Sequence, residues 1–135
     1  MPRIAAHIVA CFVLLSGVLV AAAPVLALDG DPAKGREIYT RCMACHSIDA
    51  NLVGPKHRGL FGRKAGSVPG FDYSTALKNS GIVWNADTLN QWIKDPNKLV
   101  PGNRMFVRLV PDDQERADLI AYLKIATAPT QESAK

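Results

Sequence analysis

The chain has 135 residues, which is enough for one domain and no more. Its formal net charge is +4, of which Arg3 near the N-terminus contributes one, and the remainder is too mild for nucleic-acid binding. No nucleic-acid recognition motif is present in the sequence. A mild positive charge suits docking on acidic protein surfaces, although an ordinary solvated surface would also account for it.

Residues 1–27 are predicted to be a secretory signal that is cleaved at its end. Arg3 is the only charged residue among them, a long apolar run follows it, and residues 25–27 have the small-residue spacing of a signal-peptidase site. An uncleaved membrane anchor is the alternative, because the uncharged stretch 4–28 is long enough to span a bilayer. In both cases the domain, residues 28–135, is expected outside the cytoplasm, either free in the periplasm or anchored to the membrane and facing it.

In chain order, the first predicted element is a helix over residues 31–45, in which Asp31 is a good N-cap and Pro32 suits the first helical position. Residues 47–83 are rich in glycine and proline and are expected to form loops, with a short helix near 74–79. So long an irregular stretch in a small domain indicates that something else organises it. A large buried prosthetic group would do so.

Two more helices are predicted in the C-terminal part of the chain. The first is capped by Asn85 or Asp87 and stops before Pro96. After a loop, residues 111–113 open the last helix. Its apolar positions recur at helical spacing: Ala117, Leu119, Ile120, Leu123 and Ala126. Because the sequence has no internal repeat and no convincing strand pattern, the predicted fold class is all-α, with three to five helices and long loops.

The motif with the clearest chemistry is Cys42-Met-Ala-Cys45-His46. Two thiols three positions apart on a helical turn can reach two neighbouring vinyl groups on one edge of a haem and form thioether bonds. The next residue, His46, is then placed under the iron as a ligand. This spacing is a strong signal for one covalently attached haem c.

Two other interpretations of the cysteine pair stay open on the residues alone. A thioredoxin-like redox pair would need a βαβ context, which the chain does not offer. A zinc site would need a fourth ligand, for which His57 is available.

Eight segments together make the chain resemble a class I cytochrome c, of the mitochondrial type and its periplasmic bacterial relatives. They are Gly-Arg-Glu-Ile-Tyr (35–39), Cys-Met-Ala-Cys-His (42–46), Gly54-Pro55, Gly-Leu-Phe-Gly-Arg-Lys-Ala-Gly (59–66), Gly-Phe-Asp-Tyr-Ser (70–74), Ser-Gly-Ile-Val-Trp (80–84), Pro101-Gly102 with Met105, and Glu-Arg-Ala-Asp-Leu-Ile-Ala-Tyr-Leu-Lys (115–124). The resemblance runs from Gly30 to Lys124. It implies the small monohaem cytochrome c fold, with long loops wrapped around the haem.

Met105 is the candidate for the second iron ligand. A haem electron carrier needs a sixth ligand that stays bound in both oxidation states, and a soft thioether raises the reduction potential. Met43 lies between the cysteines and should point away from the iron, whereas Met105 follows Pro101-Gly102 in a loop long enough to fold over the other haem face. Ordinary core packing is the alternative. The resemblance implies that Met105 binds the iron opposite His46.

The resemblance also implies roles for five further residues. Pro55 matches the proline whose carbonyl accepts a hydrogen bond from the proximal imidazole. Arg63, Tyr73 and Trp84 match positions that hold a haem propionate, for which their donors are chemically suited, although Tyr73 and Trp84 also suit the core. Asn103 replaces a common Thr and can hydrogen-bond on the sulfur side of the pocket.

Four further residues depart from the family pattern. His57 stands where an apolar residue usually faces the haem pocket, and it is assigned no role. Trp92 replaces a common Tyr, which changes the hydrogen bonding available on the methionine side. Val107 and Leu109 stand in place of Phe and Gly, and they predict an exposed haem edge and an altered potential.

The predicted function is one-electron transfer and not catalysis, since an iron with both axial positions filled cannot bind a substrate. A monomer is expected to dock a reductase and an oxidase or reaction centre through a basic rim around the haem edge, formed by Arg41, Lys56, Arg58, Lys94, Lys98 and Arg104. The alternatives are a haem enzyme or sensor with an open sixth position, and a structural metal-binding module without haem.

Overall fold

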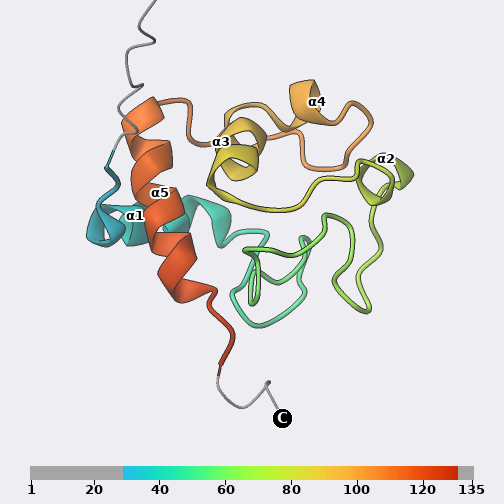
Figure 1. Cartoon of the computed structure of the whole chain (residues 1–135), viewed down its shortest axis with the longest axis horizontal. Helices are drawn as coiled ribbons and strands as arrows, with labels where there is room; N and C mark the ends of the chain where they lie inside the picture. Colours follow the sequence, from blue (N-terminus) through green and yellow to red (C-terminus); the bar gives the residue numbers. More distant parts are fainter. Residues whose placement is uncertain (1–28, 131–135) are drawn as a thin grey trace, which may run out of the picture.

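The computed structural model describes residues 29–130, and helices dominate its regular structure (Figure 1). The elements are α1 (Pro32–Tyr39), a 3-10 turn (Thr40–Cys42), α2 (Thr75–Lys78), α3 (Ala86–Lys94), α4 (Pro96–Leu99) and α5 (Asp113–Ala126). Among the described residues, the only β pairing is a single antiparallel bridge between Lys64 and Val83. The predicted all-α fold class is therefore confirmed.

The predicted signal or anchor, residues 1–27, lies outside the described residues. Within the part that the structure describes, we find no helix with the length and apolar character needed to cross a membrane.

The two terminal helices, α1 and α5, cross at close range on one side of the molecule (Figure 1). Glycine makes this approach possible, because a Cβ added at Gly35 would overlap the backbone carbonyl of Asp118. The Asp31 N–H also donates to Asp118 Oδ1 at 2.8 Å. Beside the crossing, the rings of Tyr39 and Tyr122 are 5.4 Å apart. The crossing fixes the end of α1, from which the cysteine motif follows.

The first helix is shorter than the sequence predicted. Regular α-helix ends at Tyr39 instead of reaching residue 45, and the chain tightens into the 3-10 turn. The hydroxyl of Thr40 donates to the Glu37 carbonyl at 2.6 Å, a side-chain bond that accompanies the tightening. Beyond the 3-10 turn, the His46 N–H still donates to the Cys42 carbonyl at 2.9 Å, so the motif itself closes one helical turn.

The long glycine-rich segment is mostly loop, as predicted, and its short helix α2 is capped by the Ser74 hydroxyl. Backbone hydrogen bonds tie the middle of this segment to its C-terminal end: Ala65 N–H donates to the Ile82 carbonyl at 2.8 Å and Trp84 N–H to the Arg63 carbonyl at 3.0 Å. This pairing folds the segment into a wall opposite the helices.

Helices α3 and α5 begin at side-chain caps that the sequence indicated. Asn85 caps α3 in a reciprocal arrangement with Thr88, which settles the choice between Asn85 and Asp87. Asp112 caps α5. The sequence does not predict α4, because Pro96 reads as a stop signal for the preceding helix. In the structure Asp95 caps a new turn in which Pro96 takes the first position.

Candidate haem site

A mostly apolar cavity of about 380 Å³ lies between the helices and the loop wall. Eight of the nine predicted site residues line it: Cys42, Cys45, His46, Pro55, Arg63, Tyr73, Trp84 and Met105. Buried apolar side chains complete the wall, among them Leu60, Leu77, Leu89, Leu119 and Leu123. A cavity of this kind, with few polar groups converging on it, is typical of a cofactor site.

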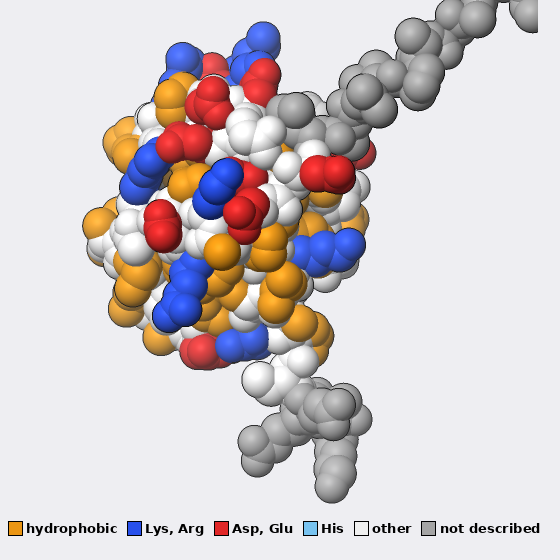
Figure 2. Space-filling model, turned by 90° about the vertical axis from the view of Figure 1, so that its left-hand side faces the viewer, with side chains coloured by type: hydrophobic (Ala, Val, Ile, Leu, Met, Phe, Trp, Pro, Cys, Tyr) orange, Lys and Arg blue, Asp and Glu red, His pale blue; other side chains and the backbone are white. Residues whose placement is uncertain are grey.

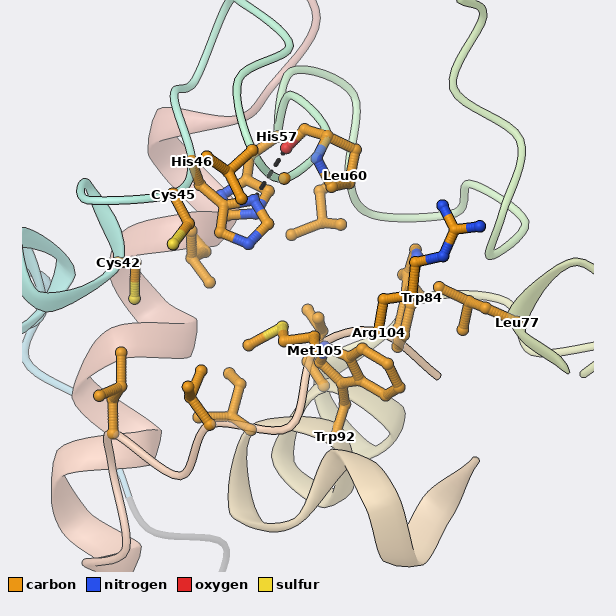
Figure 3. A pocket seen from close by; sticks show the side chains of 18 of the residues that line it. Cys42, Cys45, His46, His57, Leu60, Leu77, Trp84, Trp92, Arg104 and Met105 are labelled. Atoms are coloured by element: carbon orange, nitrogen blue, oxygen red, sulfur yellow. Dashed lines mark hydrogen bonds between the residues drawn. The ribbon is translucent and has the colours of Figure 1, made fainter. Parts of the chain in front are cut away.

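His46 presents one ring nitrogen to the cavity. Its Nδ1 lies 2.9 Å from the carbonyl oxygen of Pro55, which accepts the hydrogen bond from the ring and leaves Nε2 facing Met105 (Figure 3). A Cβ added at Gly54 would overlap the imidazole, so only glycine allows the ring to sit there. Burial lowers the pKa of His46. The ring is therefore held neutral and in the tautomer that a metal ligand requires.

The two cysteines lie at one edge of the same cavity (Figure 3). Both are free thiols, Cys42 half-buried and Cys45 exposed. Burial raises the pKa of Cys42 to about 11, so this thiol stays protonated near neutral pH. Addition to a vinyl group uses both the sulfur and its proton.

The zinc alternative finds no support in the described part of the chain. Among residues 29–130, no group of three or more Cys, His, Asp or Glu side chains is arranged to hold a metal ion. His57, the proposed fourth ligand, stacks on His46 with the ring centroids 4.4 Å apart.

Met105 lies across the cavity from His46 (Figure 3). Its backbone N–H donates to Asn103 Oδ1 at 2.6 Å. Nδ2 of Asn103 in turn donates to the carbonyls of Pro96 and Val100, at 3.0 and 2.8 Å. Asn103 is buried but does not line the cavity, and its amide is used to hold the methionine loop.

The three residues predicted to hold a propionate, Arg63, Tyr73 and Trp84, all line the cavity. Tyr73 and Trp84 are buried, and the Trp84 ring packs edge-on against Trp92 with centroids 5.4 Å apart. Arg63 donates to the carbonyls of Arg58 and Lys56, at 2.7 and 3.1 Å. Burial lowers the pKa of this guanidinium. A partly buried cation in a mostly apolar cavity favours an anionic group beside it, as a propionate would be.

Sequence reasoning missed the partnership of two residues on the proximal side. His57 lines the cavity, and its Nδ1 lies 3.1 Å from the hydroxyl oxygen of Tyr39. No pattern joins these two positions, which are 18 residues apart. The only signal was that His57 replaces an apolar residue.

Comparison with known proteins agrees with this geometry. The cytochrome c family model matches residues 32–127. Cytochrome c2 of Blastochloris viridis is 44% identical over 115 residues, which cover 82% of this chain and 91% of that protein. Cytochrome c of Sesamum indicum is 44% identical over 103 residues, covering 73% and 93%. The structure of cytochrome cH from Methylobacterium extorquens superposes with a TM-score of 0.69 and 43% identity, over 71% of this chain and 99% of that one.

A small helical protein whose cavity carries Cys-x-x-Cys-His at one edge is built to hold a covalent haem. The chain belongs to the cytochrome c family. It carries one haem c and functions as an electron carrier, not as an enzyme. The predicted fold, cofactor and class of function are thus confirmed.

Proposed function

We propose that Cys42 and Cys45 hold the haem through thioether bonds and that His46 and Met105 bind its iron from opposite sides. The observation that carries this proposal is the arrangement of one cavity. Nε2 of His46 and the side chain of Met105 face each other across it, with both cysteines at one edge (Figure 3). Bound haem supplies the reversible one-electron couple of its iron.

The protein contributes to electron transfer by holding the two proposed axial ligands rigidly. Pro55 and Gly54 hold the His46 ring in one orientation, and Asn103 holds the backbone of Met105. A site whose ligands do not move between oxidation states reorganises little during transfer. With both axial residues in place, no position is left for a substrate, which supports transfer over catalysis.

We further propose that a redox partner docks where the cavity opens to the surface. Of the predicted basic rim, Arg41 and Arg104 line the cavity. Four apolar side chains that line it are also exposed: Val53, Phe106, Val107 and Leu109. The exposure of Val107 (43%) and Leu109 (41%) agrees with the predicted uncovered haem edge.

The charges of this rim are partly compensated. Arg41 pairs with Glu115 at 2.7 Å and Arg104 with Asp72 at 2.9 Å. On the face formed by α1 and α5, Figure 2 shows basic and acidic side chains interspersed with apolar ones. The proposed docking surface therefore consists of exposed apolar side chains, bordered by arginines whose charges are partly compensated. Such a surface suits weak and rapidly reversible encounters.

The proposed place of action is the periplasm, with a reductase supplying the electron and an oxidase or reaction centre accepting it. The composition of residues 1–27 and the thioether chemistry of the motif support export. N-terminal sequencing of the purified holoprotein separates the two forms. A start at Leu28 indicates cleavage, whereas an intact Met1 with the protein in the membrane fraction indicates an anchor.

The site assignment is tested on the purified pigmented protein. We expect acidified organic solvent to leave the pigment on the polypeptide, and the oxidised protein to show the weak long-wavelength band of iron–methionine sulfur. Met105→Ala should remove this band and leave the pigment attached. Extraction of the pigment would contradict the thioethers, and rapid CO binding by the reduced wild-type protein would contradict the Met105 ligand.

A further inference from the structure

Beside the proximal imidazole lies a polar pair, the buried Tyr39 and the partly buried His57. The Tyr39 hydroxyl oxygen and His57 Nδ1 are 3.1 Å apart, within hydrogen-bond distance. The His57 ring stacks on the His46 ring, with centroids 4.4 Å apart and planes inclined by 23°. Tyr39 itself is only 4% exposed and packs between His57 and Tyr122. The pair therefore connects Tyr39, the last residue of α1, with the ring face of His46, the proposed iron ligand.

Both members of the pair are neutral where they lie. Burial raises the pKa of Tyr39 to about 12, so the phenol keeps its proton. Burial also lowers the pKa of His57 to about 3, and the charge of Arg63 adds to the effect. A neutral imidazole has one donor and one acceptor nitrogen, so the bond to Tyr39 fixes the orientation and tautomer of the His57 ring.

The pair restrains the rotation of the His46 ring. Pro55 holds the ring at Nδ1, Gly54 approaches it so closely that no Cβ fits, and His57 covers a face of it. The hydrogen bond to Tyr39 in turn fixes the plane of His57. Because the His57 ring cannot turn, its close packing against the His46 ring also limits the rotation of His46.

The pair also makes the proximal wall polar. The neighbouring wall is apolar, with Leu60, Leu119 and Leu123 buried around the same cavity. A phenol and an imidazole placed next to an iron ligand bring dipoles into this environment. Such groups stabilise the oxidised haem, which carries one more positive charge than the reduced haem, and so lower the reduction potential.

We propose that Tyr39 and His57 act as one positioning unit that sets the orientation of the His46 ring and lowers the reduction potential of the haem. The inference rests on the proposed role of His46 as an iron ligand. Both residues line the cavity, and they act through the His46 ring and through the polarity of the proximal wall.

The test compares Tyr39→Phe, His57→Leu and the double variant with the wild-type holoprotein. Tyr122→Phe is the matched control, because it removes a phenol hydroxyl from the neighbouring ring and leaves the pair intact. The measurements are the midpoint potential and the paramagnetic shifts of the haem methyl protons in the oxidised state, which report the orientation of the axial imidazole. A purely structural role would not move these methyl shifts.

We expect both single variants to raise the midpoint potential and alter the methyl pattern, His57→Leu more strongly. The double variant should change the potential by less than the sum of the two, because both single changes break the same hydrogen bond. Tyr122→Phe should leave both readouts unchanged. An unchanged potential and methyl pattern in His57→Leu, or additive shifts in the double variant, would overturn the proposal.

His57→Asn separates the two halves of the proposal, since its amide can occupy the position of Nδ1 without a stacking ring. We expect a potential near the wild-type value together with an altered methyl pattern. A potential equal to that of His57→Leu would contradict the polar effect. A wild-type protein without the iron–sulfur band, or without covalently bound pigment, would instead contradict the proposed function itself. Failure of the Tyr39–His57 proposal is therefore distinguishable from failure of the proposed function.

Discussion

Asn103 holds Met105 in place from behind. One amide group accepts the Met105 N–H at Oδ1, at 2.6 Å, and donates through Nδ2 to the carbonyls of Pro96 and Val100. The side chain is only 8% exposed, so these bonds form away from bulk water. The short helix α4 and the methionine loop are thereby tied to each other by a single residue.

Asn103→Ala should loosen the methionine loop. The change leaves the Met105 N–H without its acceptor, whereas the Pro96 and Val100 carbonyls each keep a backbone N–H donor. Since one unsatisfied buried group costs about 1–3 kcal/mol, we expect the free energy of unfolding to fall by about 1–2 kcal/mol. The iron–sulfur band should also weaken. Asn103→Thr, which restores the residue common in relatives, is the control and should show a smaller effect, measured by denaturant titration and optical spectroscopy.

Gly54→Ala should displace the His46 ring. The added Cβ would overlap the imidazole, whereas the same change at Gly70 meets nothing within 4 Å and strains only the backbone, whose φ is +72°. Strain of this kind costs about 1–2 kcal/mol. We therefore expect Gly70→Ala to lower stability and leave the haem spectrum unchanged, while Gly54→Ala alters the spectrum. Identical spectra for the two variants would contradict the packing described here.

Stability should decline in acid because of His57. Burial lowers its pKa from 6.5 to about 3. Between these values the unfolded chain binds a proton on this residue and the native protein does not, so the free energy of unfolding falls as the pH drops below 6.5. The expected slope from this one group is at most about 1.4 kcal/mol per pH unit. Denaturant titrations of the holoprotein from pH 7 to pH 4 should show a shallower decline for His57→Leu than for the wild type.

Two substitutions at the cavity mouth should separate apolar from charged docking. Phe106 is 74% exposed and lines the mouth, and Arg104 pairs with Asp72 beside it. Phe106→Ser should slow electron transfer to an isolated partner about fivefold at every ionic strength, which corresponds to about 1 kcal/mol of lost contact. Arg104→Gln should slow it at low salt only. The measurement is the second-order rate constant of electron transfer, obtained by stopped flow over a range of ionic strengths. A salt-dependent effect of Phe106→Ser would contradict apolar docking at this residue.

Much of the fold was predictable because its signals are local. Asp31 caps its helix as the sequence predicted, and Asn85 is one of the two predicted caps of α3, since capping depends on residues only three positions away. Asp112, one of the residues predicted to open the last helix, caps α5. The end of α1 was predicted too late, because nothing local distinguishes a 3-10 turn from continued helix. Helix α4 was missed because a proline that ends one helix also suits the start of another.

The residues of the candidate site were predictable where short sequence motifs determine their chemistry. The pentapeptide at 42–46 predicts the attachment edge and one axial residue, and eight of the nine predicted residues line the cavity. Asn103 turned inward to backbone carbonyls instead, because its partners depend on where α4 ends. The Tyr39–His57 bond joins two segments that only the folded chain brings together.

The crossing of α1 and α5 has a consequence for how the molecule is made. The cysteine motif follows α1 directly, yet α1 docks on a helix that begins at Asp113, near the other end of the chain. Contacts so distant in sequence close late and cost more loop entropy than local ones. A chain that lengthens from its N-terminus therefore exposes Cys42 and Cys45 well before it can build a cavity around them. The last helix completes the crevice only afterwards.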